Sequence, residues 1–572
     1  MSSVSFSERT DVALRLLDRG AQKLAQSSAG LFALVALLSI LRSLQLGQDA
    51  NWDLRNYHFY NAFALVRGRF DLDLAPAMAQ TYWNPVLDLP FYGLVAAGLN
   101  PRLIATLMAM PYAAAAFFAS KIAWQVLNSL ALSDRGIWWL LGCLVDVSGA
   151  AGAGTVASTT NDAYIAALVL AAAWTMVRPQ CVAAATRGPA WRGFVCGGFL
   201  IGLAAGLKLT AAPYAVGLCL ALAVGQPHIR RAVVAMIACT LASVAGLALA
   251  AGPWMLFLYE KFRSPLFPLF NAYFQSPFWE LANLNDSRYG ARTLWGALKL
   301  ALKLPYVLIH ETRGIVGEQW IRDYRLASVA GGLCLVVFTT VWRVSRAKSV
   351  LAATPQPGGY SLRISAQVLT FFAVSYALWL GLFSIYRYLL PLEMMTGTLL
   401  VASLVVAVRN QKVQAAIALP MIISILLTTR ALDLGRTTFG ERFFEVQLPL
   451  IASDSLVLLL DRQPLAYLIP FFPDDARFVG PWWSDYLNYD FTNPRYHNLL
   501  QQEINAAIAR HHGAIYSIEV TRTAKGDAKS GPGSAPATLP VYGLRHDSTD
   551  CQPIRSNLEK RNLSLCSLER GT

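Results

Sequence analysis

Two carboxylates follow the first long apolar run of the chain, which extends from Leu31 to Leu46. Asp49 and Asp53 come directly after it. A carboxylate that emerges from a membrane is placed to act as a general base at the lipid–water boundary, where a lipid-borne substrate presents its headgroup. Alternatively, both residues simply cap the helix that follows, because Asp is favoured at helix starts and stabilises a helix there by about 1 kcal/mol. Local sequence leaves the two interpretations open.

Two cations lie at the predicted outer ends of apolar segments. Lys208 ends a short, glycine-rich segment, and Arg387 lies in a tight turn between two segments. A charge inside a bilayer costs roughly 2.5–3.5 kcal/mol on insertion scales, so Lys208 should have a partner. We expect both side chains to bind the phosphate of a carrier lipid. The alternatives are snorkelling of Lys208 to the interface, and pairing of Arg387 with Glu393 or with lipid phosphates in general.

Three further residues are candidates for the same site. Tyr57 and His58 follow Asp53 closely, and Asp162 opens an apolar segment on the outer side. His58 could join Asp53 in the chemistry or be structural only. Asp162 could hold a loop in place or cap its helix. Asp146, by contrast, lies within a predicted span and therefore needs a polar neighbour in the bundle interior.

The composition indicates that lipid is the main solvent of this chain. Of its 572 residues, 55% are hydrophobic and 14% are charged, and the mean hydropathy is +0.42. A soluble domain carries about 25% charged residues. The net charge of +14 comes largely from basic residues in short loops between apolar segments. This distribution fits membrane topology better than nucleic-acid binding.

The apolar segments predict an all-α polytopic membrane protein with about eleven transmembrane helices, since a bilayer core needs about 20 mostly apolar residues per helix. Residues 1–28 are polar and basic without a signal-peptide cleavage site, so the first apolar run should remain as a helix. The expected spans are 29–46, 102–127, 137–153, 161–178, 193–207, 210–225, 232–252, 326–342, 365–385, 389–408 and 413–430.

The positions of Lys and Arg predict the orientation. With residues 1–28 in the cytoplasm, every cytoplasmic loop contains basic residues, as the positive-inside rule requires. The membrane domain then covers residues 29–430, with outer loops at 47–101 and 253–325. Residues 431–572 form an extracytoplasmic C-terminal domain. Any chemistry is expected on this outer face.

The outer segments are expected to be structured. Residues 51–70 and 294–309 read as amphipathic helices lying in the membrane interface. The tail reads as a small α/β or irregular domain, with a helix near 494–511 and a flexible stretch at 522–540. If this tail is extracytoplasmic, a disulfide between Cys551 and Cys566 is plausible.

The order of these features resembles the GT-C superfamily of integral-membrane glycosyltransferases over about residues 25–430. The resemblance rests on Asp53, Tyr57, Tyr60, Ala62 and Gly68, on Asn84-Pro85 with Leu89-Pro90, on Asn161-Asp162, on GLAAGLKLTAAPYA at 202–215, and on the segments 259–268 and 386–391. One departure is that Leu54, not a second carboxylate, follows Asp53. Either Asp49 supplies that carboxylate or this chain lacks it. The sequence therefore does not decide whether the site binds a divalent cation such as Mg²⁺ or Mn²⁺.

The resemblance implies an inverting hexosyl- or pentosyltransferase of a bacterial inner membrane, acting on a cell-envelope glycan, lipid or protein acceptor. The donor would be a polyprenyl-phosphate sugar. Asp53, or alternatively Asp49, would be the base. Lys208 and Arg387 would stabilise the departing phosphate, with Tyr57, His58 and Asp162 lining the site. No glycine-rich nucleotide-binding loop is visible, which agrees with a lipid-linked donor.

Other classes of membrane protein remain as alternatives. A transporter or lipid flippase should place charges deep in several spans and show a repeat of spans; the sequence shows one deep acid, Asp146, and no clear repeat. An O-antigen polymerase or ligase would rely on outer-loop arginines such as Arg288 and Arg292. A structural subunit of an envelope complex would use residues 431–572 for docking.

Overall fold

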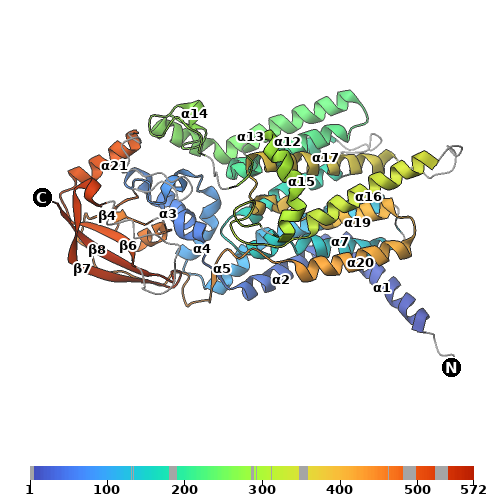
Figure 1. Ribbon diagram of the computed structural model, residues 1–572, viewed down its shortest axis with the longest axis horizontal. Helices are drawn as coiled ribbons and strands as arrows, with labels where there is room; N and C mark the ends of the chain where they lie inside the picture. Colours follow the sequence, from blue (N-terminus) through green and yellow to red (C-terminus); the bar gives the residue numbers. More distant parts are fainter. Residues whose placement is uncertain are drawn as a thin grey trace.

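The molecule consists of a helical bundle and a smaller sheet domain, with residues 47–101, the expected first outer loop, between them (Figure 1). The structure is a computed structural model. It describes residues 6–571 except 131, 133, 179–189, 285–288, 292, 311, 347–358, 462, 481–497 and 522–538. The expected flexible stretch at 522–540 therefore lies almost entirely outside the described residues, as do Arg288 and Arg292.

The bundle is formed by helices that are mostly apolar, apart from the more polar α1. These are α1 (Phe6–Gln26), α2 (Ser28–Leu46), α5 (Pro101–Met108), α6 (Met110–Ser129), α7 (Arg135–Val147), α9 (Asp162–Val177), α11 (Ala190–Leu207), α12 (Ala212–Val224), α13 (Ile229–Phe262), α16 (Arg325–Arg346), α17 (Gly359–Leu382), α19 (Thr396–Ala407) and α20 (Gln411–Thr428). Among the described residues, six helices are long and apolar enough to cross a membrane, or seven if one bent pair counts as a span. Several others are shorter, so the expected count of eleven is not confirmed.

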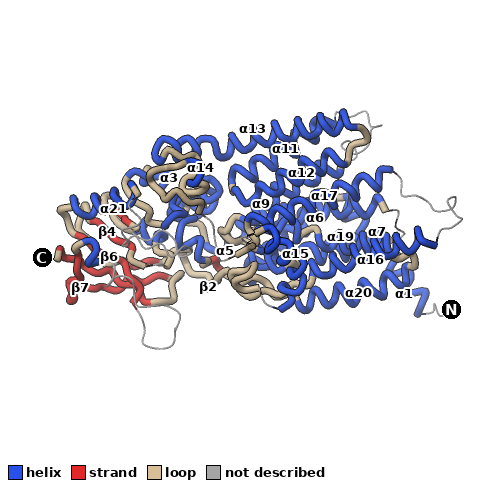
Figure 2. The backbone as a smooth tube through the Cα atoms, turned by 45° about the horizontal axis from the view of Figure 1, so that its top comes forward, coloured by secondary structure: helices blue, strands red, loops and turns tan. Residues whose placement is uncertain are grey.

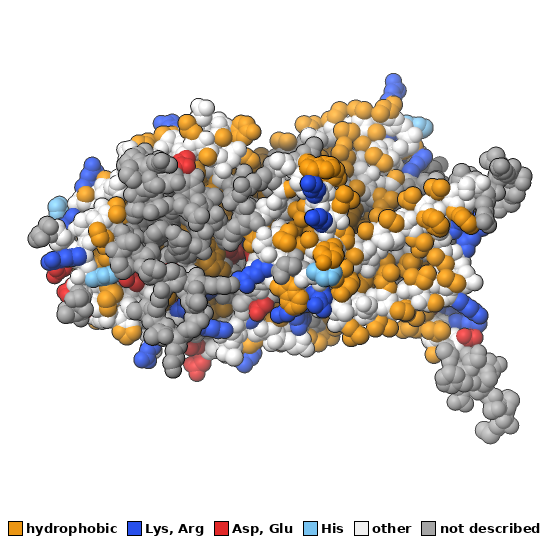
Figure 3. Space-filling model, in the orientation of Figure 1, with side chains coloured by type: hydrophobic (Ala, Val, Ile, Leu, Met, Phe, Trp, Pro, Cys, Tyr) orange, Lys and Arg blue, Asp and Glu red, His pale blue; other side chains and the backbone are white. Residues whose placement is uncertain are grey.

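The outer surface of the bundle is apolar. Helix α13 has a mean hydropathy of 2.3 over its most apolar window, yet only 22% of that window is buried inside the protein. On the face drawn in Figure 3, hydrophobic side chains are abundant over the helical bundle. Helices that leave so much apolar surface uncovered are stable when lipid covers that surface. A helix also suits a bilayer because its backbone polar groups are hydrogen-bonded within the helix itself. This confirms the expectation of a polytopic membrane protein.

Two of the expected spans are interrupted. Residues 137–153 form α7 and, after a break at Ser148, the short helix α8 (Ala150–Thr155). The Glu393 carboxylate accepts hydrogen bonds from the backbone N–H groups of Ala151 (2.9 Å) and Gly152 (2.7 Å), at the start of α8. Residues 386–407 are likewise bent by 49° between α18 (Leu390–Glu393) and α19. These breaks are stabilised by tertiary contacts that local hydropathy does not reveal.

Charges inside the bundle are paired. The Asp146 carboxylate accepts hydrogen bonds from Gly397 N (2.7 Å) and Thr398 Oγ1 (2.7 Å), which provides the polar neighbour expected for it. Arg325 donates to Asp323 at 3.0 Å, and both side chains are fully buried. These groups fix one helix against another, as satisfied buried polar networks do.

The C-terminal domain contains a six-stranded mixed sheet (Figure 2). Its strands are β3 (Val446–Gln447), β4 (Leu456–Leu459), β5 (Arg477–Val479), β6 (Ile515–Thr521), β7 (Leu544–Ser556) and β8 (Asn562–Arg570), in the order β3-β7-β8-β6-β4-β5. β4 is parallel to β5 and β6, and the other pairs are antiparallel. The helix expected near 494–511 is α21 (Leu499–Arg510). Cys551 and Cys566 form a disulfide between β7 and β8.

The first outer loop is buried between the two parts, which corrects the expectation of an amphipathic helix on the membrane surface. Residues 54–58 form a π-helical turn, η1 (Leu54–His58), followed by α3 (Phe59–Arg67), which ends at Gly68 with φ +66°. Every residue from Phe59 to Ala64 is buried. The sheet domain covers this segment, and Phe59 stacks on Phe444 with ring centroids 4.2 Å apart. A sequence pattern cannot show which faces a distant domain will cover.

A buried arginine joins this loop to the sheet domain. Arg69 donates to both carboxylate oxygens of Asp73, each at 2.8 Å, and to the backbone oxygens of Asp474 and Ala476. The Asp73 carboxylate also accepts the N–H of Phe478 in β5 at 3.0 Å. The short strands β1 (Gln48–Asp49) and β2 (Arg436–Thr437) add a second connection. The segment after Asp53 is therefore held from both sides.

The second expected interfacial helix is α15 (Leu294–His310), which lies on the outside of the bundle. Its exposed side chains are largely apolar or basic, including Trp295, Leu298, Lys299, Leu302 and Lys303. This arrangement is typical of a helix lying at a membrane interface.

Candidate active site

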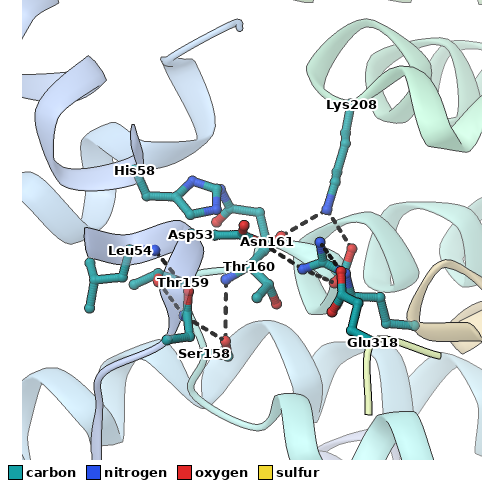
Figure 4. Close-up of polar contacts among 12 residues, drawn as sticks. Asp53, Leu54, His58, Ser158, Thr159, Thr160, Asn161, Lys208 and Glu318 are labelled. Atoms are coloured by element: carbon teal, nitrogen blue, oxygen red, sulfur yellow. Dashed lines mark hydrogen bonds and ion pairs between the residues drawn. The ribbon is translucent and has the colours of Figure 1, made fainter. Parts of the chain in front are cut away.

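Five segments that are far apart in sequence bring charged side chains together where the bundle meets the first outer loop (Figure 4). Asp53 precedes η1, Asp162 is the first residue of α9, and Lys208 lies between α11 and η5 (Leu209–Ala211). Arg387 lies in η6 (Tyr386–Leu389), and Glu318 lies in the loop between α15 and α16. Three carboxylates and two cations therefore share one site.

Arg387 is the centre of this cluster. Its Nη1 donates to Asp53 Oδ2 at 2.7 Å and lies 3.8 Å from Asp162 Oδ2, and its Nη2 lies 3.2 Å from Glu318 Oε1. The Arg387 side chain is only 8% exposed and the Asp53 side chain 13%. The alternative pairing of Arg387 with Glu393 is not formed, because the Glu393 carboxylate is occupied at the start of α8.

Lys208 is the second cation of the site. Its Nζ donates to Asp162 Oδ1 at 2.5 Å and to the backbone oxygen of Thr160 at 2.8 Å. Asp162 thus provides the partner that Lys208 needs at the end of an apolar segment. The ring of Tyr388 lies under both cations, 5.0 Å from Lys208 Nζ and 5.2 Å from Arg387 Cζ. Cation–π contacts of this kind help to hold the two charges in place.

Asp53 is ionised at neutral pH. Burial alone would raise the pKa of its carboxyl, but the charge and hydrogen bond of Arg387, with a smaller contribution from Lys208, hold that pKa below its ordinary value. Asp53 does not cap its helix; the Asn51 side chain instead accepts the N–H of Leu54 at 2.8 Å. The capping interpretation is therefore wrong for Asp53, whose carboxylate faces Arg387.

Asp49 has different surroundings. Its carboxylate accepts hydrogen bonds from Thr159 N (2.8 Å), Thr159 Oγ1 (2.9 Å) and Asn51 Nδ2 (2.8 Å). The side chain is buried within this network. Such a carboxylate anchors the loop before α9. The geometry favours Asp53 over Asp49 as the reactive acid.

His58 and Tyr57 lie beside Asp53. The rings of Tyr57 and His58 are 4.0 Å apart, and Tyr57 also packs against Trp83. His58 Nδ1 lies 2.6 Å from Asp88 Oδ1, and Asn161 Nδ2 donates to the same oxygen at 2.6 Å. Burial and the charge of Asp53 raise the pKa of Tyr57 well above its ordinary value, so its phenol stays neutral.

The structure thus brings together Asp53, Tyr57, His58, Asp162, Lys208 and Arg387, and places Asp49 beside them in a separate network. Sequence reasoning missed Glu318 and Asp88. Asp88 could have been noticed, because it follows the Asn84-Pro85 turn in the same outer loop as His58. Glu318 gives no signal in its own segment, since only the folded chain brings it to Arg387.

The described residues do not fit a Mg²⁺ or Mn²⁺ ion at this site. Such ions take a cage of oxygen ligands, and Asp53, Asp162 and Glu318 do converge. However, the Arg387 guanidinium lies within 3.8 Å of all three carboxylates, and a divalent ion there would face a fixed cation at close range. A second group, Glu519, His546 and Cys566, offers no thiolate because Cys566 is in the disulfide.

Comparisons with known proteins give one match. No protein-family model and no curated protein matches the sequence. Among solved structures, one shares 10% sequence identity with the chain, covers 86% of this chain and 69% of the other, and has a TM-score of 0.39. It is the Archaeoglobus fulgidus oligosaccharyltransferase tethered by a disulfide to an acceptor peptide containing the NVT sequon.

Proposed function

We propose that this protein is a glycosyltransferase that moves a sugar from a polyprenyl-phosphate carrier to an acceptor hydroxyl on the outer face of the membrane. The observation that carries the proposal is the buried contact of Asp53 with Arg387, next to the pair of Asp162 and Lys208. An ionised carboxylate beside two fixed cations offers a base for the acceptor and a binding place for a phosphate.

Both cations retain hydrogen-bond capacity for a phosphate. Arg387 has five N–H donors, and its buried Nε has no partner among the described residues. Lys208 has three donors, of which Asp162 and the Thr160 carbonyl take two. Fixed donors aimed at charge that develops on a leaving group are worth about 3–4 kcal/mol each in comparable enzymes.

Phosphate binding would also activate Asp53. Arg387 is the largest of the influences that lower the pKa of this carboxyl. A phosphate that pairs with Arg387 offsets that positive charge, so the pKa of Asp53 rises and the carboxylate becomes a stronger base. Donor binding and base activation are thereby coupled through one guanidinium.

The reaction is a single displacement. Asp53 takes the proton from the acceptor hydroxyl, and the oxygen attacks the anomeric carbon from the face opposite the phosphate. The carbon–oxygen bond to the phosphate breaks, and its electron pair goes to the phosphate oxygen that Arg387 and Lys208 bind. One displacement inverts the anomeric configuration. The acceptor is a glycan, lipid or protein hydroxyl.

The position of the site fits a lipid-linked donor. It lies where apolar helices meet the first outer loop, so a polyprenyl chain can stay in the bilayer while its headgroup reaches Lys208 and Arg387. In this proposal residues 1–28 are cytoplasmic, residues 29–430 form the domain of a bacterial inner-membrane protein, and residues 431–572 lie outside the cytoplasm. Disulfides form in such oxidising compartments, as the pair Cys551–Cys566 would require.

A transfer assay tests the proposal. Purified protein in lipid is given undecaprenyl-phosphate hexoses and pentoses with a cell-envelope extract as acceptor, and the release of undecaprenyl phosphate is measured. Wild-type protein should release it, and Asp53→Asn should do so ~10²–10⁴-fold more slowly. The matched control is Asp71→Asn, an exposed acid of the same loop. Equal rates for wild type and Asp53→Asn would overturn the assignment.

The same assay separates the alternatives. An O-antigen polymerase or ligase would depend on Arg288 and Arg292 and tolerate Asp53→Asn. A flippase would move lipid-linked sugar across vesicles without consuming it. The buried charges of the bundle, such as Asp146 and the pair Asp323–Arg325, hold backbone groups and one another. This arrangement favours the enzyme over a transporter.

A further inference from the structure

His58 and Asp88 form a buried pair whose geometry is that of an oriented imidazole. The two side chains are 4% and 3% exposed, and Nδ1 lies 2.6 Å from the carboxylate oxygen. Asn161 fixes the same oxygen with a second hydrogen bond of 2.6 Å. The contact spans two elements, because Asp88 lies at the end of η4 (Val86–Asp88) and His58 at the end of η1.

The contact sets the tautomer of the ring. An ionised carboxylate can only accept hydrogen bonds, so Nδ1 carries the hydrogen, and in the neutral ring the lone pair then lies on Nε2. Nε2 is buried and has no hydrogen-bond partner among the described residues. A buried polar atom without a partner is unfavourable in a folded protein and calls for a role. Here the atom is a basic nitrogen next to the proposed site.

The π-helical turn places this nitrogen near Asp53. Asp53 immediately precedes the turn and His58 ends it, five residues later. In a turn closed by i→i+5 hydrogen bonds, residue i+5 comes round to the side of the helix that residue i occupies. Figure 4 shows the imidazole beside Asp53.

We propose that the proton which Asp53 removes from the acceptor hydroxyl passes on to Nε2 of His58, where Asp88 stabilises the resulting imidazolium. The inference rests on the proposed function. The acceptor O–H bond breaks, Asp53 carries the proton briefly, and an N–H bond forms at Nε2 while Asp53 returns to its ionised form. The proton leaves to water when the products depart.

The relay answers a weakness of Asp53 as a base. A carboxylate is ordinarily a weaker base than an imidazole, so the proton is bound more strongly once it reaches the neighbouring ring. Among the described residues, the charged groups near the imidazole include Asp88 from η4, Asp53 at the start of its own turn, and Arg387 and Lys208, whose charges act on the Asp53 carboxyl. Once a proton reaches Nε2, the Asp88 and Asp53 carboxylates offset the charge of the imidazolium.

The test compares His58→Gln and Asp88→Asn with wild type in the transfer assay with undecaprenyl-phosphate sugars, over a range of pH. His58→Gln should lower kcat about 10²-fold, leave the KM for the donor within about threefold, and remove one limb of the pH–rate profile. Asp88→Asn keeps an oxygen that can accept from Nδ1 but loses the charge. It should lower kcat less and shift that limb to lower pH, because the imidazolium is less stabilised.

The outcomes distinguish this inference from the proposed function. If His58→Gln and Asp88→Asn keep the wild-type kcat and pH profile while Asp53→Asn is inactive, the relay is wrong and the transferase stands. If wild type transfers no sugar, both are wrong. If His58→Gln fails to fold, as thermal unfolding would reveal, Asp88→Asn decides. A loss of kcat by Asp88→Asn without a shift of the limb would then contradict the relay.

Discussion

Arg387 donates to Asp53 at 2.7 Å across 334 residues of sequence, so the turn before α18 is held against the start of the first outer loop. The same guanidinium reaches Glu318 and Asp162. A contact that joins the proposed base to the proposed phosphate-binding cation makes their properties interdependent. Changes at one residue should therefore appear in the behaviour of the other.

Replacing Arg387 should change the pH dependence of transfer. Without the guanidinium, burial still raises the pKa of Asp53 while the largest influence that lowers it is gone. The pKa of Asp53 therefore rises in Arg387→Gln, and the acid limb of kcat/KM moves to higher pH. The donor KM should rise as well. Arg387→Lys should show a smaller shift, since one ammonium cannot span Asp53 and Glu318. An unmoved limb in Arg387→Gln would show that Asp53 is not the group that titrates.

Lys208 should contribute to donor binding more than to folding. Lys208→Ala removes one of two cations for the phosphate and leaves Asp162 with an unpaired carboxylate, so we expect kcat/KM to fall about 10²-fold, by analogy with the loss of one fixed donor. Isothermal titration with an undecaprenyl-phosphate sugar measures the loss of affinity directly. Lys299→Ala on the exposed face of α15 is the matched control and should bind normally. Normal binding by Lys208→Ala would refute the phosphate assignment.

Asp49 and Asp53 should separate into a structural and a reactive acid. Asp49→Asn keeps one oxygen but disturbs hydrogen bonds from Thr159 and Asn51, so it should lower the free energy of unfolding by about 1–3 kcal/mol. Its remaining activity per folded molecule should be close to that of wild type. Asp53→Asn should show the reverse pattern. Unfolding in detergent and turnover, measured on the same samples, check both; equal loss of turnover would put both acids in the chemistry.

How far the sequence predicts this molecule depends on how local each signal is. The sequence alone singles out Asp53, Lys208 and Arg387, because each charge lies close to the end of an apolar run. A charge in such a position is costly unless it has a partner or a function. Glu318 and Asp88 carry no such local mark, and only the folded chain brings them to Arg387 and His58. The burial of Phe59 and its neighbours was missed for the same reason, since the covering surface lies about 385 residues away at Phe444.

The joint between the first outer loop and the sheet domain should be essential for stability. Asp73→Ala removes the partner of buried Arg69 and the acceptor for Phe478 N, and breaking a buried pair from one side costs about 3–5 kcal/mol. Limited proteolysis should then release the sheet domain sooner. Asp71→Ala is the control: its pair with Lys261 is 84% exposed on the acid side and should contribute less than about 1 kcal/mol. Equal protease resistance in both variants would mean that β1–β2 suffices as the connection.

The disulfide should stabilise the sheet domain. Cys551 and Cys566 are 15 residues apart, and closing a loop of that length stabilises a folded domain by about 3 kcal/mol in the chain-entropy treatment. The double variant Cys551→Ser/Cys566→Ser should unfold at a lower temperature, and dithiothreitol should have the same effect on wild type. Cys334→Ser, at an exposed free cysteine of α16, should unfold like wild type. Unchanged melting of the double variant would mean that the β7–β8 pairing is stable alone.

The orientation of the chain can be tested with two exposed lysines. Lys560 lies in the turn between β7 and β8, and Lys412 lies near the start of α20, whose other end leads into the sheet domain. If the site faces outward, a membrane-impermeant maleimide should label Lys560→Cys in intact spheroplasts and Lys412→Cys only after permeabilisation. The protein without the introduced cysteine gives the background labelling of the native cysteines. The reverse pattern would place the sheet domain and the Asp53–Arg387 site in the cytoplasm, where the proposed disulfide would be reduced and a donor presented in the outer leaflet could not reach Lys208.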